Sequence, residues 1–293
     1  MAVEAERLAR ELFSIHSRAH PLPGEFDDNF HLTAAEGEYA LKIMRPGCAP
    51  EFVDMQARAM EHLRDFPVPQ SLGIRTTEDG RLAWLLRWLP GRMMAEVTHT
   101  PAMLKNLGRL LGAIDLALAG FSHPFAHREL KWDMARSLWI EDYVHYIPDR
   151  ARQDLVRRIL AEFRNAAPLA GVRCGVIHGD AHTHNVLVEG DRITGLLDFG
   201  DLHYGAWVSE LAVACAYLQF CETNPRAAMD RVIGGYQESN PLTDIEMKSL
   251  PLLIQTRLAV SVTNSAYLKT NSSDPYITVS ETGAWRLLEV LCC

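Results

Sequence analysis

The sequence predicts an α+β protein of two lobes: a small N-terminal lobe built on an antiparallel β-sheet with helices, and a larger, mainly helical C-terminal lobe. Two observations lead to this prediction. Before about residue 90, short runs with alternating side chains recur and are separated by turn residues. After the break at Pro90-Gly91, most segments have the apolar spacing of helices. We therefore predict an N-terminal lobe of residues 1–89 and a C-terminal lobe of residues 90–293.

Length and composition exclude several classes of protein. The chain has 293 residues and is 48% hydrophobic, which is enough to bury one large core or two lobes. A net charge of -8 disfavours a general polyanion binder, so we expect no nucleic-acid partner. The first residues mix charged and apolar positions, unlike a signal peptide, and no later apolar run could span a bilayer. We expect no membrane partner, and the pattern contains no indication of an oligomeric state.

Cysteine usage indicates the compartment. The six cysteines show neither C-x-x-C spacing nor the density of a secreted disulfide scaffold. This distribution fits a reducing environment, so we expect a cytoplasmic protein.

The N-terminal lobe is predicted to begin with an amphipathic helix, followed by two strands joined at residues 36–37. Side chains alternate along a strand, so Leu41 and Ile43 point to one face and Lys42 to the other, otherwise apolar face. A further helix and two more strands, separated by turn residues 78–80, complete this lobe.

The C-terminal lobe is predicted to begin at Thr100, which can cap a helix that has Pro101 in its first turn and ends near Gly120. Thr243 and Glu246 have the spacing of a capping box. Further helices are expected around residues 150 to 166, 207 to 222, 225 to 236, 243 to 270 and 275 to 290.

Three polar side chains are expected to meet at one end of a β-hairpin. The stretch "VIHGDAHTHNVLV" rises as a short strand into a turn, and "NVLVEGDRITGLLDFGD" has the pattern of a hairpin. Asp180, Asn185 and Asp198 would converge there. Phosphoryl transfer from a nucleotide needs a carboxylate to accept the proton of a hydroxyl group, and oxygen ligands for magnesium. Lys42 could meet the phosphates from the other lobe.

These motifs resemble a known superfamily. "HGDAHTHN" followed by "LLDFGD" is similar to the H-G-D-x-x-x-x-N and D-F-G pair of the aminoglycoside phosphotransferases and choline kinases, relatives of the protein kinases. "FDDNFHL", "LRWLPGR" and "PLTDIEMKSLPLLIQTRLAVSV" look like the hydroxylysine kinase branch. The resemblance covers nearly the whole chain. It implies a protein-kinase-like fold, ATP or GTP with Mg²⁺ as cofactors, and a small-molecule hydroxyl substrate such as hydroxylysine or, alternatively, an aminoglycoside.

The resemblance also implies residue roles. Asp180 would be the catalytic base, Asn185 and Asp198 the magnesium ligands, and Lys42 the phosphate-binding lysine. Adenine would be held by the backbone of the hinge residues Arg87, Trp88 and Leu89. Two features depart from the protein-kinase pattern: the phosphate-covering stretch "PLPGEFDDNFHL" has one glycine, and Gln56 occupies the place of the glutamate that usually pairs with the lysine. The partner of Lys42 is therefore open.

The acceptor pocket is predicted more coarsely. Its candidate residues are Trp132, Asp133, Tyr204, Trp207, Glu210 and Arg257. Aromatic and acidic side chains would suit a cationic amine, and Arg257 would suit a carboxylate. Arg257 stands alone among apolar residues of a helix that should be buried. It should therefore meet either a protein carboxylate such as Glu210 or a carboxylate of the substrate.

Two other functions compete with a kinase. A zinc hydrolase would use Asp180 with His178, His182 and His184, because alternate residues of a strand point to one side. The sequence has neither an H-E-x-x-H helix nor an eightfold strand-helix repeat, which disfavours that class. A catalytically inactive, kinase-like binding module is disfavoured because all four expected chemical groups are present. We expect His178 to support the loop through hydrogen bonds.

Overall fold

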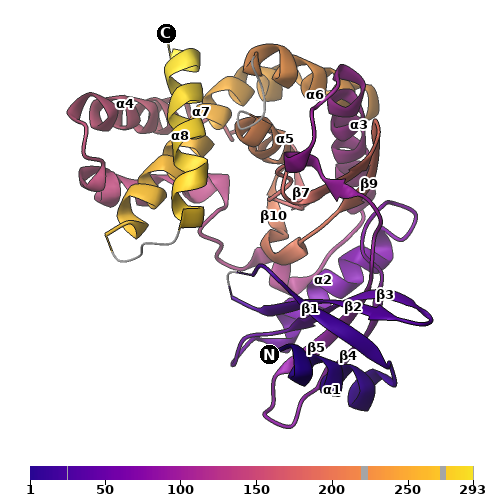
Figure 1. Ribbon diagram of the computed structural model, residues 1–293. Coiled ribbons are helices and arrows are strands. Elements are labelled where there is room, and N and C mark those ends of the chain that lie inside the picture. Colours follow the sequence, from indigo (N-terminus) through magenta and orange to yellow (C-terminus); the bar gives the residue numbers. More distant parts are fainter. Residues whose placement is uncertain (25, 219–223, 271–274, 293) are drawn as a thin grey trace.

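The computed structural model describes residues 1–24, 26–218, 224–270 and 275–292. Figure 1 shows a sheet-based lobe that contains the N-terminus and a larger helical lobe that contains the C-terminus. The predicted two-lobed α+β architecture is confirmed.

The N-terminal lobe is a five-stranded antiparallel sheet with a helix on each face. The strand order is β1-β2-β3-β5-β4. One face packs its apolar residues against α1, and Trp84 on the other face belongs to the large core that includes α2. The elements are α1 (Ala2–Phe13), β1 (Ser17–Leu22), β2 (Asp28–Ala34), β3 (Gly37–Ile43), α2 (Pro50–His62), β4 (Ser71–Thr76) and β5 (Leu82–Arg87).

The register of this sheet turns Lys42 toward the other lobe. Lys42 lies opposite Asn29 of β2 and Trp84 of β5. Its neighbours Leu41 and Ile43 are buried against α1. Because side chains alternate along the strand, Lys42 points to the opposite face, as the sequence predicts.

The linker between the lobes is attached to the C-terminal lobe. The short strand β6 (Arg92–Met93) pairs with β8 (Val186–Glu189), which pairs in turn with β9 (Arg192–Leu196). Gly91 has a φ of 122°, and a Cβ atom there would lie 2.4 Å from the hydroxyl oxygen of Thr194. That hydroxyl donates to the carbonyl of Pro90 at 2.7 Å. Glycine is therefore required where the linker meets the β8–β9 hairpin.

The C-terminal lobe consists of helices around two small sheets. The predicted cap at Thr100 and the capping box of Thr243 and Glu246 are both present. The fifth helix ends at Tyr217, and residues 219–222 of its expected range lie outside the described residues. The helices are α3 (Pro101–Leu118), α4 (Arg150–Ala166), α5 (Trp207–Tyr217), α6 (Pro225–Ser239), α7 (Asp244–Leu268) and α8 (Pro275–Cys292), and β7 (Cys174–Ile177) pairs with β10 (His203–Ala206). None of the helices in the described ranges combines the length and apolar character that a membrane crossing requires.

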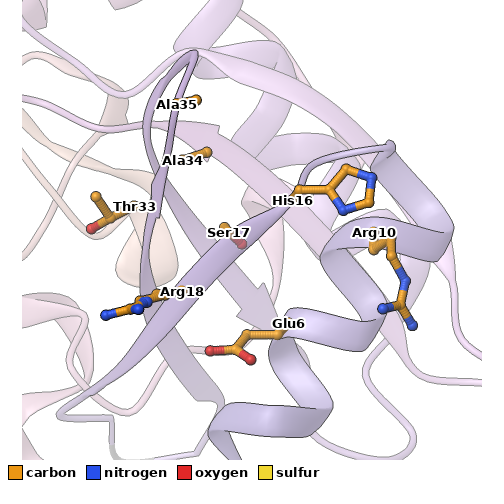
Figure 2. A pocket seen from close by; sticks show the side chains of 8 residues that line it. All are labelled: Glu6, Arg10, His16, Ser17, Arg18, Thr33, Ala34 and Ala35. Atoms are coloured by element: carbon orange, nitrogen blue, oxygen red, sulfur yellow. The ribbon is translucent and has the colours of Figure 1, made fainter.

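Edge strand β1 was not predicted from the sequence. It lacks an apolar alternation because Ala19 is its one buried residue, and it contains Pro21, which an edge position tolerates. The carboxylate of Glu6 on α1 accepts from the backbone N–H of Ala19 at 3.0 Å and so covers part of the open edge. A hollow of about 410 Å³ remains beside it (Figure 2), lined by Glu6, Arg10, His16, Ser17, Arg18, Thr33, Ala34 and Ala35. It contains none of the predicted site residues.

Candidate active site

Strand β7 leads into the loop that carries Asp180, and His178 fixes this loop. The His178 ring is fully buried, and its Nε2–H donates to the carbonyl of Leu197 at 2.9 Å. Its Nδ1 accepts from the backbone N–H of Asp180 at 3.2 Å. Gly179 turns the chain with a φ of 80°. His178 therefore ties the loop to the end of β9, as the sequence predicts.

Asn185 is oriented by Asp180. Its Nδ2 donates to the Asp180 carboxylate oxygen Oδ2 at 2.9 Å and to the Asp180 carbonyl at 3.0 Å. Within the described ranges, no group donates to the amide oxygen of Asn185. The backbone N–H of Leu197 donates to the Asn185 carbonyl at 2.7 Å, which places Asn185 beside the segment that carries Asp198.

Asp198 has a left-handed backbone, with φ 58° and ψ 83°. This conformation is uncommon for a residue other than glycine and costs about 1–3 kcal/mol, so surrounding contacts must hold it. Oδ1 accepts from the backbone N–H of Gly200 at 3.2 Å. The side chain remains 54% exposed, so a carboxylate held in this way is accessible to a metal ion.

Lys42 reaches this carboxylate from the other lobe. Its Nζ lies 3.7 Å from Asp198 Oδ1. Gln56, which was expected beside the lysine, is 1% exposed, and its Nε2 donates to the carbonyl of Phe52 in its own helix at 3.1 Å. The nearby Asp54 contacts Arg58 and His123 instead. The structure thus pairs Lys42 with Asp198, and the Gln56 side chain forms a hydrogen bond within its own helix.

The three hinge residues differ in whether their backbone N–H groups already have an acceptor. The N–H of Arg87 donates to Gln70 at 2.9 Å and that of Trp88 to Glu38 at 3.2 Å. The Trp88 ring stacks on His31 with 3.9 Å between centroids. In the described ranges, the N–H of Leu89 has no acceptor. The N–H of Leu89 could therefore donate to an acceptor atom of a nucleobase, whereas the N–H groups of Arg87 and Trp88 are already hydrogen-bonded.

The charges around Asp180 assign it as the ionised carboxylate. Burial works against its ionisation, but His182, 3.4 Å away, and Arg257, 3.7 Å away, hold the pKa of Asp180 below its ordinary value. Burial disfavours the imidazolium of His182, but the carboxylate beside it raises the His182 pKa. Burial, together with Asp180, raises the pKa of Asp201 to about 7. Of these two neighbouring carboxyls, the surroundings favour the ionised form in Asp180 and the protonated form in Asp201.

Arg257 does not pair with Glu210, which corrects one of the two expected partners. The guanidinium is 2% exposed and lies between the rings of Trp132 and Tyr217, at 4.9 and 5.5 Å from their centroids. Nη1 donates to the Trp132 carbonyl at 3.3 Å, and Nη2 faces Asp180. Its protein carboxylate is therefore the proposed base itself.

Glu210 holds the loop that carries Asp180 in place through a hydrogen bond. It is 1% exposed, and its Oε2 accepts from the backbone N–H of Gly179 at 2.7 Å. Burial raises the pKa of Glu210. This bond makes Glu210 a positioning group for the loop, and its expected contact with substrate stays a prediction.

The remaining candidates for the acceptor pocket differ in their contacts and in their exposure. Trp132 is brought to Asp180 through Arg257. Asp133 caps the following 3₁₀ segment by accepting from Ala135 at 2.9 Å and is 21% exposed. Tyr204 is 46% exposed and packs on His127, whereas Trp207 is buried. Because Trp207 packs on Gly175 and under the Arg173 guanidinium, its expected role in the acceptor pocket is not supported.

The histidines of the motif do not form a metal cage. The rings of His182 and His184 are 5.8 Å apart, and one contacts Asp180 while the other is exposed. Within the part of the chain that the structure describes, no three His, Cys, Asp or Glu side chains are grouped for a metal ion. This arrangement disfavours the zinc hydrolase.

Three residues near the site were missed by the sequence analysis. Lys131 and Asn264 contact each other at 2.6 Å beside Trp132. His182 contacts Asp180, whereas the sequence pattern indicated only a zinc-binding role for it. Two signals were available in the sequence. Lys131 is next to a candidate tryptophan, and Asn264 follows Arg257 by seven residues.

The comparisons with known sequences agree on one family of enzymes. Residues 18–245 match the profile of the phosphotransferase enzyme family. Hydroxylysine kinase from Mus musculus is 29% identical over a 332-residue alignment that covers 98% of this chain and 88% of that protein. Homoserine kinase from Methylobacterium nodulans is 31% identical over 251 residues, covering 79% and 74% of the two chains. The resemblance to the hydroxylysine kinase branch is confirmed.

Solved structures confirm the fold. A microcompartment-associated aminopropanol kinase has a TM-score of 0.76 at 17% identity, over 98% of this chain and 96% of its own. The aminoglycoside phosphotransferase APH(4)-Ia, in a ternary complex with ADP and hygromycin B, has a TM-score of 0.69 at 16% identity, over 98% and 97%. The protein-kinase-like fold predicted from the motifs is the fold of these neighbours.

Proposed function

Because the chain belongs to the phosphotransferase enzyme family, we propose that it transfers the γ-phosphoryl group of ATP, or of GTP, to a hydroxyl group of hydroxylysine or a related amine-bearing alcohol. The observation that carries the proposal is the convergence of four groups from both lobes. The Asp180 carboxylate accepts a hydrogen bond from Asn185, and the Asn185 carbonyl accepts one from the residue before Asp198. The Asp198 carboxylate forms an ion pair with Lys42.

Each group has one task in this proposal. Asp180, ionised and oriented by its neighbours, accepts the proton of the substrate hydroxyl as the hydroxyl oxygen approaches the γ-phosphorus. Lys42 binds the phosphates, and the backbone of Leu89 binds the nucleobase. The N-terminal lobe, residues 1–89, would thus hold the nucleotide, and residues 90–293 would hold the acceptor.

A divalent ion fits the donor set. The amide oxygen of Asn185 and the exposed carboxylate of Asp198 are the hard oxygen ligands that Mg²⁺ prefers. When bound, magnesium would neutralise charge on the phosphate oxygens. Asn185 and Asp198 would hold it, and the hydrogen bonds to Asp180 and Gly200 keep both side chains in place.

The acceptor is proposed from the relatives. Hydroxylysine kinases and homoserine kinases, by their names, act on amino acids that carry a hydroxyl group. The aminoglycoside phosphotransferases share the fold at under 20% identity and make an antibiotic the alternative acceptor.

A coupled assay that follows ADP formation tests the proposal. Hydroxylysine, homoserine, aminopropanol, choline and hygromycin B would each be offered with MgATP and with MgGTP, using the Asp180→Asn variant as the matched control. We expect turnover with an amino-acid acceptor that the variant loses. Equal ADP formation by both proteins would contradict the proposal.

A further inference from the structure

Helix α7 carries a polar stripe on a face that is otherwise buried. Arg257, Ser261 and Asn264 follow one another at spacings of four and three residues, so they share one face. Their exposed fractions are 2%, 7% and 7%. Buried polar groups require partners, and this stripe has them in elements around the catalytic loop.

The partners of the stripe define one side of the acceptor region. Arg257 meets Asp180, and the Ser261 hydroxyl lies 3.1 Å from the hydroxyl of Tyr217. At the far end, the amide oxygen of Asn264 accepts from Lys131 Nζ at 2.6 Å. The stripe thus runs from the proposed base to a second cation.

Lys131 is held on an aromatic surface. Its Nζ lies 4.3 Å from the centroid of the Trp139 ring and 5.3 Å from that of Trp132. Lys131 is nevertheless exposed, unlike Arg257. An ammonium group fixed by two indole rings and an amide oxygen is oriented in advance for an anionic ligand.

The two cations of this region have different accessibility. Arg257 and Lys131 lie within about 10 Å of each other, because each is about 5 Å from the same Trp132 centroid. Arg257 is enclosed, and its charge is compensated by Asp180. Lys131 is exposed, and its ammonium beside Trp132 attracts an anionic group and repels a substrate ammonium.

Trp139 supplies a further donor in this region. Its Nε1–H is buried, and within the described ranges no group accepts from it. Buried donors without a partner are uncommon, and a ligand oxygen would satisfy this one.

We infer that Lys131, fixed by Trp132, Trp139 and Asn264, binds the carboxylate of the acceptor, which makes the substrate a hydroxy amino acid and excludes a carboxylate-free amino alcohol as the preferred substrate. This inference rests on the proposed function. Arg257 and Asn264 are about 10 Å apart along α7, at 1.5 Å per residue. A chain with a few carbon atoms between its hydroxyl and its carboxylate would extend from Asp180 toward Lys131.

Two matched pairs of acceptors test the inference. Each pair consists of an amino acid and its decarboxylated counterpart: homoserine with 3-aminopropan-1-ol, and 5-hydroxylysine with 1,5-diaminopentan-2-ol. The readout is the ratio of kcat/KM within each pair. We expect the wild type to favour an amino acid, and Lys131→Met to reduce that ratio by about 10- to 100-fold, the loss expected for a hydrogen bond to a charged group.

Two further variants serve as controls. Lys131→Arg keeps a cation and should keep most of the preference. Lys248→Met removes an exposed lysine at the other end of α7 and should leave the ratio at its wild-type value. Melting temperatures of all variants verify that each is folded.

The outcomes separate the inference from the proposed function. A wild type that favours the amino alcohols, or a Lys131→Met variant with the wild-type ratio, overturns the carboxylate site and leaves the phosphotransferase. Nucleotide binding without turnover of any of the four compounds also overturns it. A protein that binds no nucleotide contradicts the proposed function itself.

Discussion

Arg257 Nη2 lies 3.7 Å from Asp180 Oδ1, so a buried guanidinium on α7 faces the proposed base in the catalytic loop. The carbonyl of Trp132 and the rings of Trp132 and Tyr217 fix this guanidinium. The pair joins the C-terminal helices to the chemistry, because the arginine both holds the carboxylate in place and favours its ionised form.

Removal of this arginine should impair catalysis with every acceptor. In Arg257→Met, Asp180 loses its cation, so kcat should fall by about 10- to 100-fold while nucleotide affinity is retained. Arg257→Lys should recover part of the loss. Steady-state kinetics with an amino acid and an amino alcohol measure it. A rise in KM for the amino acid alone would instead make Arg257 a substrate ligand.

Replacement of the base should separate catalysis from binding. Asp180→Asn keeps the shape of the side chain and can still meet Asn185, but it cannot accept the hydroxyl proton. We expect kcat to fall by about 10²- to 10⁴-fold. Calorimetric titration with a non-hydrolysable ATP analogue should give a dissociation constant close to that of the wild type. Turnover at the wild-type rate would remove Asp180 from its assigned role.

Metal dependence should follow the oxygen ligands. EDTA should abolish turnover, and Mg²⁺ or Mn²⁺ should restore it, since Asn185 and Asp198 offer oxygen atoms. A zinc-selective chelator should have no effect. Asp198→Asn should raise the Mg²⁺ concentration needed for half-maximal rate. Stoichiometric zinc that is lost together with activity would revive the hydrolase hypothesis.

The buried Glu210 allows a matched pair of variants. Glu210→Ala leaves the backbone N–H of Gly179 without its acceptor, which should lower the free energy of unfolding by about 1–3 kcal/mol. The catalytic loop should also lose order, so kcat should fall. Glu210→Gln retains a carbonyl oxygen at this place and should be closer to the wild type in both quantities. Urea unfolding and kinetics measure the two effects, and equal losses in both variants would contradict the role in loop support.

Asp115 on α3 should make stability dependent on pH. It is fully buried and accepts from the hydroxyl of Tyr236, and burial, with Glu210 nearby, holds its pKa well above the usual range. Between pH ~4 and that raised pKa, the folded state keeps a proton that the unfolded state releases, so stability falls as pH rises. Asp115→Asn cannot titrate.

The free energy of unfolding of Asp115→Asn, relative to the wild type, should therefore increase from pH 5 to pH 8. Urea unfolding at pH 5, 6, 7 and 8 measures this difference. Parallel pH profiles for the two proteins would show that Asp115 is ionised in the folded state.

Local sequence pattern was sufficient for the catalytic loop and for Lys42. The spacing from Asp180 to Asn185 places both in one turn, and strand alternation fixes the face of Lys42. The partner of Arg257 was not predictable in this way, because it depends on a contact between segments far apart in the chain. Lys131 was missed for the same reason: its ammonium becomes informative through Asn264, 133 residues later.

The β8–β9 hairpin is attached to the N-terminal part of the chain at two places. The hydroxyl of Thr194 donates to the carbonyl of Pro90, directly before the pairing of β6 with β8. The backbone N–H of Leu196 donates to the carbonyl of Pro67 at 2.8 Å. Two fixed points define an axis, so a rotation of the N-terminal lobe that keeps both hydrogen bonds would turn about the line from Pro67 to Pro90.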